Sequence, residues 1–204
     1  MRKIFVTGIG TDVGKTIVSS IITEALQADY WKPIQCGDLE FTDSHKVKRL
    51  ISCKKTVFHP EAYMFKTAAS PHVAAEIEKK QIRLSKLKAP ETNNTLVIEG
   101  AGGLLVPYNY RGDTMLDIIK ENQAEVILVS RNYLGSINHT LLTLECLATH
   151  DIKIIGIIFN GPENLATEKV ILNKTRVNFL GRIKEEFILN PSIIQEYAQQ
   201  YIFI

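Results

Sequence analysis

The chain has 204 residues, of which 45% are hydrophobic and 23% charged, and its formal net charge is +2 at pH 7. This composition fits one globular domain with a sizeable core and excludes a largely disordered chain. Because the basic residues are scattered, we expect no nucleic-acid partner. The short basic run Lys46–Arg49 is expected to be a solvated helix face.

The cysteines and the first residues of the chain indicate the cellular compartment in which the protein is expected. Three cysteines at wide spacing, Cys36, Cys53 and Cys146, argue against a disulfide framework or zinc site and favour a reducing environment. The start, Met-Arg-Lys followed at once by a core strand, leaves no room for a signal peptide, and no apolar stretch reaches membrane length. We therefore expect a cytoplasmic protein with no membrane partner.

Short aliphatic runs alternate with helical patterns along the whole chain, without repeats or linkers. The predicted strands span residues 3–7, 29–33, 95–99, 125–129, 153–159 and 178–183. The predicted helices span residues 14–27, 43–52, 71–79, 114–121, 136–148, 164–175 and 192–201. Runs such as Val126–Val129 are apolar on both faces, which predicts one α/β domain over residues 1–204 with a mostly parallel sheet covered on both faces by helices. Ligands of such sheets bind beyond the carboxyl ends of the strands, where we expect every candidate residue below.

The first loop carries the strongest motif. Residues 8–16 read Gly-Ile-Gly-Thr-Asp-Val-Gly-Lys-Thr between a predicted strand and a predicted helix, which is the context of a phosphate-binding loop. Gly8 lies one position too early for the usual spacing, so the loop is a variant with Thr11 and Asp12 added at its tip. Lys15 can reach the β- and γ-oxygens, and the Thr16 hydroxyl can ligate Mg²⁺. The sequence predicts nucleoside triphosphate binding; the alternative is a chance glycine-rich turn.

The helix predicted after this loop has one apolar face, made by Val18, Ile21, Ile22, Ala25 and Leu26. This spacing predicts that the helix packs on the sheet with its N-terminus directed at the phosphates.

Two strand ends carry charged candidates. The predicted strand 95–99 ends at Glu99 and is followed by a glycine-rich segment that we expect to be a flexible turn. An acid at this point of a phosphate-loop enzyme holds Mg²⁺ directly or through water, so Glu99 is the metal candidate, with a helix cap or a surface acid as the alternative. Lys32 closes another predicted strand, where a solvated lysine explains the residue equally well.

Two helix starts carry polar residues with local explanations. Asp43 follows Thr42 at the head of a predicted helix and by itself is more often an N-cap than a ligand. Ser70 followed by Pro71 is typical of a helix start, so capping is the leading local explanation there. His72 can titrate near neutral pH, but the sequence shows no partner for it.

Two further segments have both a binding and a structural interpretation. Residues Leu134–His139 lead into a helix whose free backbone N–H groups can hold a carboxylate, with capping by Ser136 as the alternative. Asn160 ends a predicted strand. An Asn at this point usually stabilises a turn, and the alternative is that its side-chain amide pairs with the edge of a purine.

The motifs together, in this order, resemble the dethiobiotin synthetase family over residues 4 to about 183. They are Thr-Gly-Ile-Gly-Thr-Asp-Val-Gly-Lys-Thr, Lys32-Pro33, Thr42-Asp43, Ser70-Pro71-His72, Glu99-Gly-Ala-Gly-Gly, Leu134-Gly-Ser-Ile-Asn-His and Phe159-Asn160. Related phosphate-loop families share the first motif and an acid, but not the rest of the combination. The resemblance implies a phosphate-loop NTPase-like, three-layer α/β fold.

The resemblance also implies an activity. Enzymes of this family carboxylate 7,8-diaminononanoate with CO₂ and close its ureido ring, giving dethiobiotin, ADP and phosphate in biotin biosynthesis. The implied cofactor is Mg²⁺, ATP is the co-substrate, and the implied assembly is a homodimer.

Roles of individual residues follow from the same resemblance. It implies catalytic roles for Lys15, Lys32 and Thr11. The implied nucleotide contacts, with Asn160 facing the adenine, are Gly10, Asp12, Val13, Gly14, Lys15, Thr16, Glu99 and Asn160. The implied Mg²⁺ ligands are Thr16, Asp43 and Glu99. The implied substrate contacts, the last four from across a dimer interface, are Thr11, Lys32, Cys36, Ser70, Pro71, Gly102, Gly135, Ser136, Ile137 and Asn138.

The chain departs from the family pattern in three places. Cys36 stands where a small, often hydroxyl-bearing residue is expected, so any hydrogen bond there is weaker. The stretch between His72 and Glu99 is short and lacks part of a helix. The chain after Ile183 is also brief, which leaves the far side of the base pocket without assigned residues.

Two other functions compete with this interpretation. A partitioning-type ATPase switch shares the fold but carries an extra lysine near the start of the loop, where this chain has Gly10, and tends to show a basic face or amphipathic tail that is not evident here. An amide-forming ligase of the cobyrinate type needs a glutamine-hydrolysing domain with its own nucleophilic cysteine, for which this chain has no room.

Overall fold

A computed structural model of the chain describes residues 1–201 and contains a seven-stranded sheet in the order β4-β2-β6-β1-β7-β8-β9. The strands of this sheet are β1 (Lys3–Gly8), β2 (Asp29–Trp31), β4 (Phe58–His59), β6 (Leu96–Gly103), β7 (Glu125–Arg131), β8 (Ile154–Asn160) and β9 (Phe179–Ile183). Each neighbouring pair is parallel. The predicted α/β class and the parallel sheet are confirmed.

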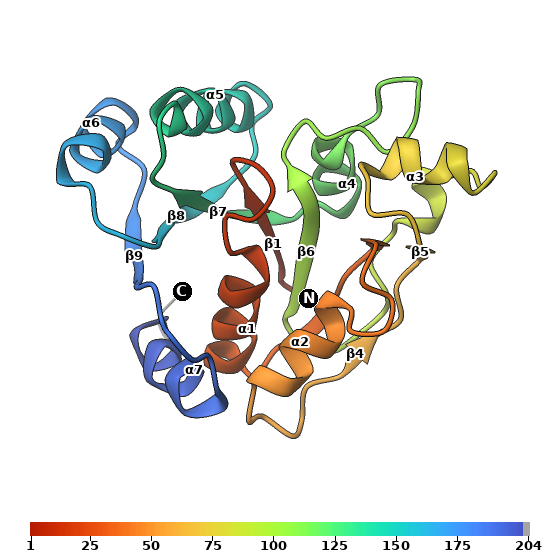
Figure 1. Cartoon of the computed structure of the whole chain (residues 1–204), viewed down its shortest axis with the longest axis horizontal. Coiled ribbons are helices and arrows are strands. Elements are labelled where there is room, and N and C mark those ends of the chain that lie inside the picture. The colour runs from red at the N-terminus through yellow and green to blue at the C-terminus, as the bar shows by residue number, and fades with distance from the viewer. Residues whose placement is uncertain (202–204) are drawn as a thin grey trace.

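Helices cover both faces of the sheet (Figure 1). One face carries α1 (Lys15–Leu26), α2 (Asp43–Leu50) and α7 (Pro191–Ala198), which pack against one another. The other face carries α4 (Met115–Asn122), α5 (Ser136–Thr149) and α6 (Leu165–Thr175). The three predicted layers are therefore present. Within residues 1–201, no helix has the length and apolarity that a bilayer crossing needs.

Alternation along the strands separates two cores. Ile4 and Val6 of β1 are fully buried in the core that contains α1, whereas Phe5 between them is buried in the core that contains α4. The apolar face predicted for α1 is confirmed, because Val18 and Ile22 are fully buried against the first of these cores. This packing directs the N-terminus of α1 at the carboxyl edge of the sheet.

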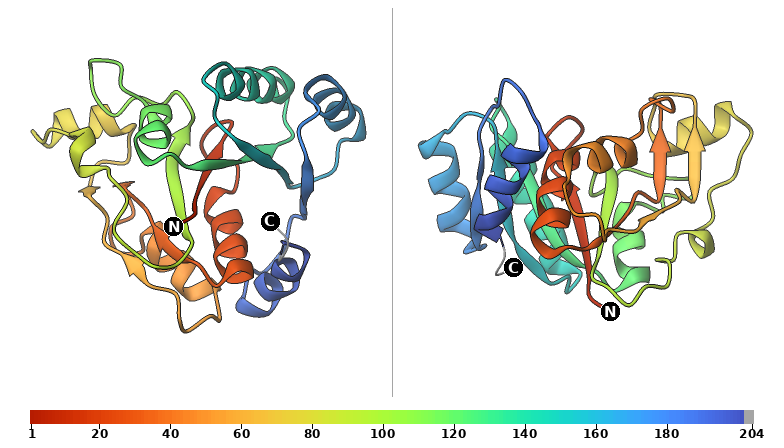
Figure 2. Two further views of the ribbon diagram at one scale, coloured as in Figure 1. Left: turned by 180° about the vertical axis from the view of Figure 1, so that it is seen from behind. Right: turned by 90° about the horizontal axis from the view of Figure 1, so that it is seen from below.

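A sharp corner follows β2. The sequence predicts one strand over 29–33, but β2 ends at Trp31, and the chain resumes after Pro33 as β3 (Ile34–Cys36). Strand β3 pairs in parallel with β5 (Tyr63–Phe65) in a separate two-stranded sheet, seen at one end of the molecule in Figure 2. Proline has no N–H for the ladder, so Pro33 ends the first sheet and leaves Lys32 at the corner between the two sheets.

Strand β6 is longer than predicted, and the expected flexible turn after Glu99 is wrong. The strand continues to Gly103, and its register with β1 shifts from Val6 opposite Glu99 to Gly8 opposite Gly103. A Cβ atom on Gly100 would lie 2.7 Å from the Phe5 ring, so glycine there serves close packing in an irregular strand. Glu99 therefore lies inside a strand, and not at its end as predicted.

The segment between helix α3 (Pro71–Ile77) and β6 holds only one short 3₁₀ turn, Leu84–Lys86. The buried Asn122 of α4 ties this segment down. Its Oδ1 accepts from the Ala89 N–H at 2.6 Å, and its Nδ2 donates to the Leu87 carbonyl at 2.9 Å. One side chain thus replaces the backbone bonds that a longer helix would make.

We predict that Asn122→Ala lowers the free energy of unfolding by about 2–4 kcal/mol, because the buried carbonyl of Leu87 and the half-buried N–H of Ala89 lose their partner. Urea unfolding measures the change. The matched control is Glu121→Ala, which removes only an ion pair with the exposed Lys88 at 3.2 Å and is expected to change stability by less than about 1 kcal/mol. Equal, small effects of the two substitutions would show that Asn122 does not hold the segment.

Candidate active site

The loop between β1 and α1 is tied to the end of β8. Asn160 donates from Nδ2 to the Val13 carbonyl at 2.9 Å, and Lys15 donates from Nζ to the Gly10 carbonyl at 2.8 Å. Gly14, at the N-cap of α1, has φ of +97°, and a Cβ atom there would come within 2.2 Å of Asn160 Nδ2. Only glycine fits this position without strain or displacement of Asn160. The Asn160 amide thus serves loop geometry, the structural alternative considered for it.

A cavity of about 740 Å³ opens above this loop. It brings together most of the candidate residues, namely Thr11, Asp12, Gly14, Lys15, Thr16, Lys32, Cys36, Asp43, Ser70, Pro71, Glu99, Gly102 and Asn160. The same cavity is lined by residues that the sequence analysis did not single out, including Gln35, Asp38 and Arg131. Lys46 also lines it, and the expectation of a solvated helix face is wrong for this residue, because it is half-buried and pairs with Asp43. Gly10 and Val13 belong to the loop but do not line the cavity.

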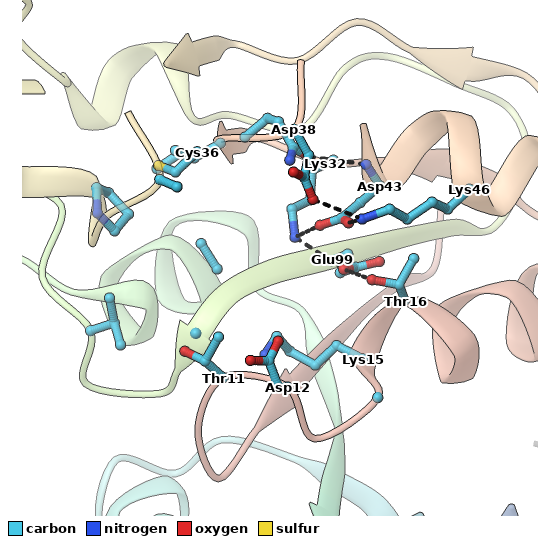
Figure 3. A pocket seen from close by; sticks show the side chains of 18 of the residues that line it. Thr11, Asp12, Lys15, Thr16, Lys32, Cys36, Asp38, Asp43, Lys46 and Glu99 are labelled. Carbon is cyan, nitrogen blue, oxygen red and sulfur yellow. Dashed lines mark hydrogen bonds and ion pairs between the residues drawn. The ribbon is translucent and has the colours of Figure 1, made fainter. Parts of the chain in front are cut away.

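Lys32 stands at the centre of a buried ion cluster (Figure 3). Its Nζ lies 2.8 Å from Asp43 Oδ2 and 3.0 Å from Glu99 Oε1. The Thr16 hydroxyl donates to the same Glu99 oxygen at 2.8 Å. Only 4% of Lys32 and 1% of Glu99 is exposed, so neither the solvated lysine nor the surface acid considered above is present.

Tyr30 completes the cluster, although sequence reasoning missed it. Its hydroxyl donates to Glu99 Oε2 at 2.8 Å, so both carboxylate oxygens of Glu99 are engaged. Burial, together with the charge of Glu99, raises the pKa of Tyr30 well above its usual value, which keeps the hydroxyl a donor. The spacing in the sequence could have revealed this role, because Tyr30 lies two residues before Lys32 and the side chains of alternate strand residues share a face.

Asp43 is not the N-cap of α2, and that expectation is wrong. The cap is Thr42, whose hydroxyl accepts from the His45 N–H at 3.3 Å while its own N–H donates to His45 Nδ1 at 3.2 Å. Asp43 is therefore free to contact Lys32 and Lys46, the latter at 3.2 Å. Burial alone would raise the pKa of Asp43, but these two ammonium groups lower it below the usual value, so the carboxylate stays ionised.

The two buried lysines differ in charge state. Burial, and next the nearby charge of Lys32, lowers the pKa of Lys15 to about 8. Burial also disfavours the charge of Lys32, but Glu99 and Asp43 outweigh it and raise the pKa of Lys32 to about 12. Lys32 is therefore a permanent cation at physiological pH, whereas the charge of Lys15 depends on what binds beside it.

The other end of the cavity is less polar. Pro71 forms the first turn of α3, with Ser70 at its N-cap position, but the Ser70 side chain makes no capping bond. Burial raises the pKa of Cys36 to about 11 despite the nearby Lys32, so this residue is a neutral thiol at pH 7. Gln35, which sequence reasoning missed, accepts from the Asp43 N–H at 3.2 Å and so joins β3 to α2. His72 does not line the cavity, and its Nδ1 lies 3.2 Å from the Pro107 carbonyl.

The predicted carboxylate loop lies elsewhere. Gly135, Ile137 and Asn138 line a second cavity of about 750 Å³ between the starts of α5 and α6, and none of them lines the first. Ser136 is buried, with its Oγ accepting from the Tyr133 N–H at 3.3 Å, while Gly135 takes the N-cap position. One chain therefore does not bring this loop into the phosphate-loop cavity.

The oxygen atoms at the cluster fit Mg²⁺. Carboxylate and hydroxyl oxygens of Asp43, Glu99 and Thr16 lie together in the cavity of the phosphate loop, and two of these carboxylates already share one cation, the Lys32 ammonium. Residues 1–201 contain no group of three or more His, Cys, Asp or Glu side chains able to hold a metal by themselves. A cation here would thus need ligands from a bound phosphate and water, which is the usual mode for Mg²⁺.

A parallel sheet with this loop before α1 defines a phosphate-loop NTPase, and residues 2–192 match the model of a family described as an AAA domain. Solved structures agree. The septum site-determining protein MinD complexed with Mg-ADP from Pyrococcus horikoshii superimposes with a TM-score of 0.61 at 14% identity, covering 98% of this chain and 95% of that one. A putative plasmid partition protein from Borrelia burgdorferi gives 0.58 at 14% identity, covering 98% and 96%. At this identity the likeness shows the fold alone.

Curated relatives are much closer in sequence. ATP-dependent dethiobiotin synthetase BioD of Christiangramia forsetii is 52% identical over 98% of this chain and 96% of its own length. The enzyme of the same name from Cytophaga hutchinsonii is 50% identical over 97% and 96%, and that of Chlamydia pneumoniae is 41% identical over 98% and 90%. The chain belongs to the dethiobiotin synthetase family. The partitioning ATPases are only distant structural relations.

We predict that the protein takes up about half a proton when it binds ADP at pH 8, because a phosphate beside Lys15 raises a pKa that lies at about 8 in the free protein. ADP affinity should consequently fall as the pH rises above 8. Calorimetry in buffers of different ionisation enthalpy measures the uptake. Lys15→Arg, whose charge is permanent, should show none. Equal uptake by both proteins would refute the role assigned to Lys15.

Proposed function

We propose that this chain carboxylates 7,8-diaminononanoate with CO₂ and closes the ureido ring, using ATP and Mg²⁺ and releasing dethiobiotin, ADP and phosphate. The observation that carries the proposal is the position of Lys32, a permanent cation between Asp43 and Glu99 in the same cavity as the phosphate loop. A partitioning-type switch has its extra lysine in the loop, at the position of Gly10, and needs no charge beside a second substrate.

The chemistry needs charge stabilisation more than a nucleophilic side chain. One amine of the substrate adds to CO₂ and gives a carbamate, whose oxygen attacks the γ-phosphorus of ATP and displaces ADP. The second amine then attacks the carbamoyl carbon, and the bond to the phosphate oxygen breaks. The reacting groups are anionic at each stage, so Lys15 and Lys32 stabilise the oxygens on which charge develops. Mg²⁺, held by Thr16, Asp43 and Glu99, would neutralise charge on the phosphates.

The diamine is assigned to the end of the cavity beside Cys36 and Ser70. Thr11, Cys36, Ser70, Pro71 and Gly102 would line the diamine site, since they share the cavity with Lys32. The neutral Cys36 thiol offers a weaker hydrogen bond than a hydroxyl, but no competing nucleophile.

Asn160 is the proposed contact for adenine. Its Nδ2 is held by Val13, and within residues 1–201 its Oδ1 accepts no hydrogen bond. An unpaired acceptor at the rim of the cavity suits an exocyclic amino group.

We infer a homodimer in which the loop from Gly135 to Asn138 serves the partner's substrate. Tyr133 and Leu134 have exposed side chains and line the second cavity together with this loop. Contiguous exposed apolar surface marks an interface, and the N-terminus of α5 is a suitable site for a carboxylate. A two-fold axis would place the loop of each chain at the site of the other.

The direct test is an assay of purified protein with ATP, Mg²⁺, diaminononanoate and bicarbonate, omitting one component at a time. Phosphate release should require all four components and should equal dethiobiotin formed, measured by mass spectrometry. ATP hydrolysis at the full rate without the diamine would contradict the proposal and favour a switch.

We predict that Lys32→Ala lowers dethiobiotin formation by about 10²–10³-fold and changes ATP affinity by only a few-fold, because the charge acts mainly on the transferring group. Lys32→Arg should restore little, since a planar guanidinium has a different reach. Calorimetry and steady-state rates separate the two effects, and the exposed Lys48→Ala is the control. A collapse of ATP affinity in a folded Lys32→Ala protein would make Lys32 a phosphate anchor instead.

Glu99→Gln and Asp43→Asn should each lose Mg²⁺-dependent turnover while the protein stays folded, because the substitution keeps the shape and removes the ligand charge, and the remaining carboxylate still compensates Lys32. Rates measured across a range of Mg²⁺ concentrations, with circular dichroism and melting as the fold check, test this. Near-normal activity at low Mg²⁺ would exclude the altered residue as a ligand.

The shared site predicts complementation between two inactive variants, Lys32→Ala and Gly135→Glu. A mixed dimer rebuilds one intact site from the unaltered Lys32 of one chain and the unaltered carboxylate loop of the other. After subunit exchange, random pairing should restore roughly a quarter of normal activity. Background activity despite exchange confirmed by mass spectrometry would show that each chain holds a complete site.

A further inference from the structure

The order of the strands indicates on which side of β1 the base of a bound nucleotide lies. Glu99 of β6 and Lys32 after β2 lie on one side of β1, whereas Arg131 and Asn160, at the ends of β7 and β8, lie on the other. The phosphate loop lies between the two sides, directly after β1. If the γ-phosphoryl group faces Lys32, as the proposed function requires, the base must extend towards the β7 and β8 side.

Arg131 stands on that side with its side chain held in place. It pairs in register with Asn160 and lines the same cavity. Its Nη2 donates to Glu185 Oε1 at 2.8 Å, in the segment after β9. Between these ends the side chain passes over Gly161, where a Cβ atom would lie 3.6 Å from the Arg131 Cζ and 3.7 Å from its Nε. The guanidinium is therefore anchored across the ends of β8 and β9.

Stability does not explain this arrangement. The side chains of Arg131 and Glu185 are 38% and 63% exposed, and ion pairs with that exposure contribute little to the free energy of unfolding. Charge for the phosphates is supplied by Lys15 in the loop and by Lys32 on the other side, while the Arg131 side chain is directed away from the loop towards β9. What remains is a planar, partly desolvated cation at the base end of the cavity, and a guanidinium in such a position stacks on aromatic rings.

We propose that Arg131 stacks on the purine base of the bound nucleotide and that Glu185 is the positioning residue that holds the guanidinium in the required plane. This inference rests on the proposed function, because the direction of the nucleotide depends on it. Arg131 would then supply part of the far side of the base pocket, for which the short chain after Ile183 left no assigned residue.

The test compares ADP with inorganic tripolyphosphate, which has phosphates but no base, in the presence of Mg²⁺. Arg131→Ala should weaken ADP binding about tenfold and leave tripolyphosphate binding unchanged within twofold. Arg131→Lys should not restore ADP binding, because an ammonium lacks the stacking plane.

Two further measurements extend the test. Arg131→Ala should weaken the binding of CDP less than that of ADP, because the cytosine ring offers less stacking area, and Glu185→Gln should weaken ADP binding about threefold. Lys184→Ala, which removes a neighbouring exposed charge, is the matched control and should have no effect.

The outcomes separate the two proposals. Equal weakening of ADP and tripolyphosphate by Arg131→Ala would make Arg131 a phosphate ligand, and recovery in Arg131→Lys would make its effect one of charge; either result overturns stacking. Unaltered ADP binding in Arg131→Ala, with a wild-type protein that binds both ligands, overturns this proposal alone. A wild-type protein that binds neither ligand would contradict the proposed function itself.

Discussion

The structure depends on one buried cation and the carboxylates around it. A lysine with almost no exposed surface is tolerated only when opposite charges compensate its lost hydration. Lys32 meets this condition at the corner between the two sheets, where Asp43 from α2 and Glu99 from β6 contact its ammonium group. Thr16 joins the phosphate-loop helix to the same carboxylate as Lys32. Removing Lys32 leaves its two carboxylates without their shared cation, so the cluster holds α2, β6 and the start of α1 in fixed positions around the corner between the sheets.

This constraint explains how one cavity can serve two substrates. Because β1 separates the cluster from the ends of β7 and β8, the proposed reaction places the nucleotide across the sheet edge, with its reacting phosphate near Lys32 and its base near Asn160. The space beyond the cluster, beside β3 and α3, is then left for a small acceptor, and its neutral Cys36 thiol adds no competing nucleophile. Geometry and charge thus support a ligase, whereas the fold alone is equally compatible with a switch.

Much of this was predictable from the sequence, and the failures have physical causes. Long periodic segments such as α1 and β7 were predicted closely, because burial of one or both faces produces a regular spacing of apolar residues in the sequence. Strands of two or three residues, such as β4, are too short to show such a spacing. Glu99 was expected at a strand end because neither the register shift between β6 and β1 nor the close packing of Gly100 on Phe5 can be recognised in a sequence pattern. Lys32 and Arg131 stand at strand ends, where sequence cannot distinguish a solvated cation from one held by carboxylates distant in the chain.

In the proposed reaction, ATP and a carbamate react with each other in this cavity, and transfer of ¹⁸O reveals whether they do. With ¹⁸O-labelled bicarbonate in unlabelled water, quenched before bicarbonate exchanges with the solvent, a carbamate oxygen that attacks the γ-phosphorus leaves with the phosphate. We expect one ¹⁸O atom in each phosphate released, in equal amount to dethiobiotin, with label also in the ureido carbonyl. Phosphate whose fourth oxygen comes from water would show ATP hydrolysis and would exclude attack of the carbamate on ATP.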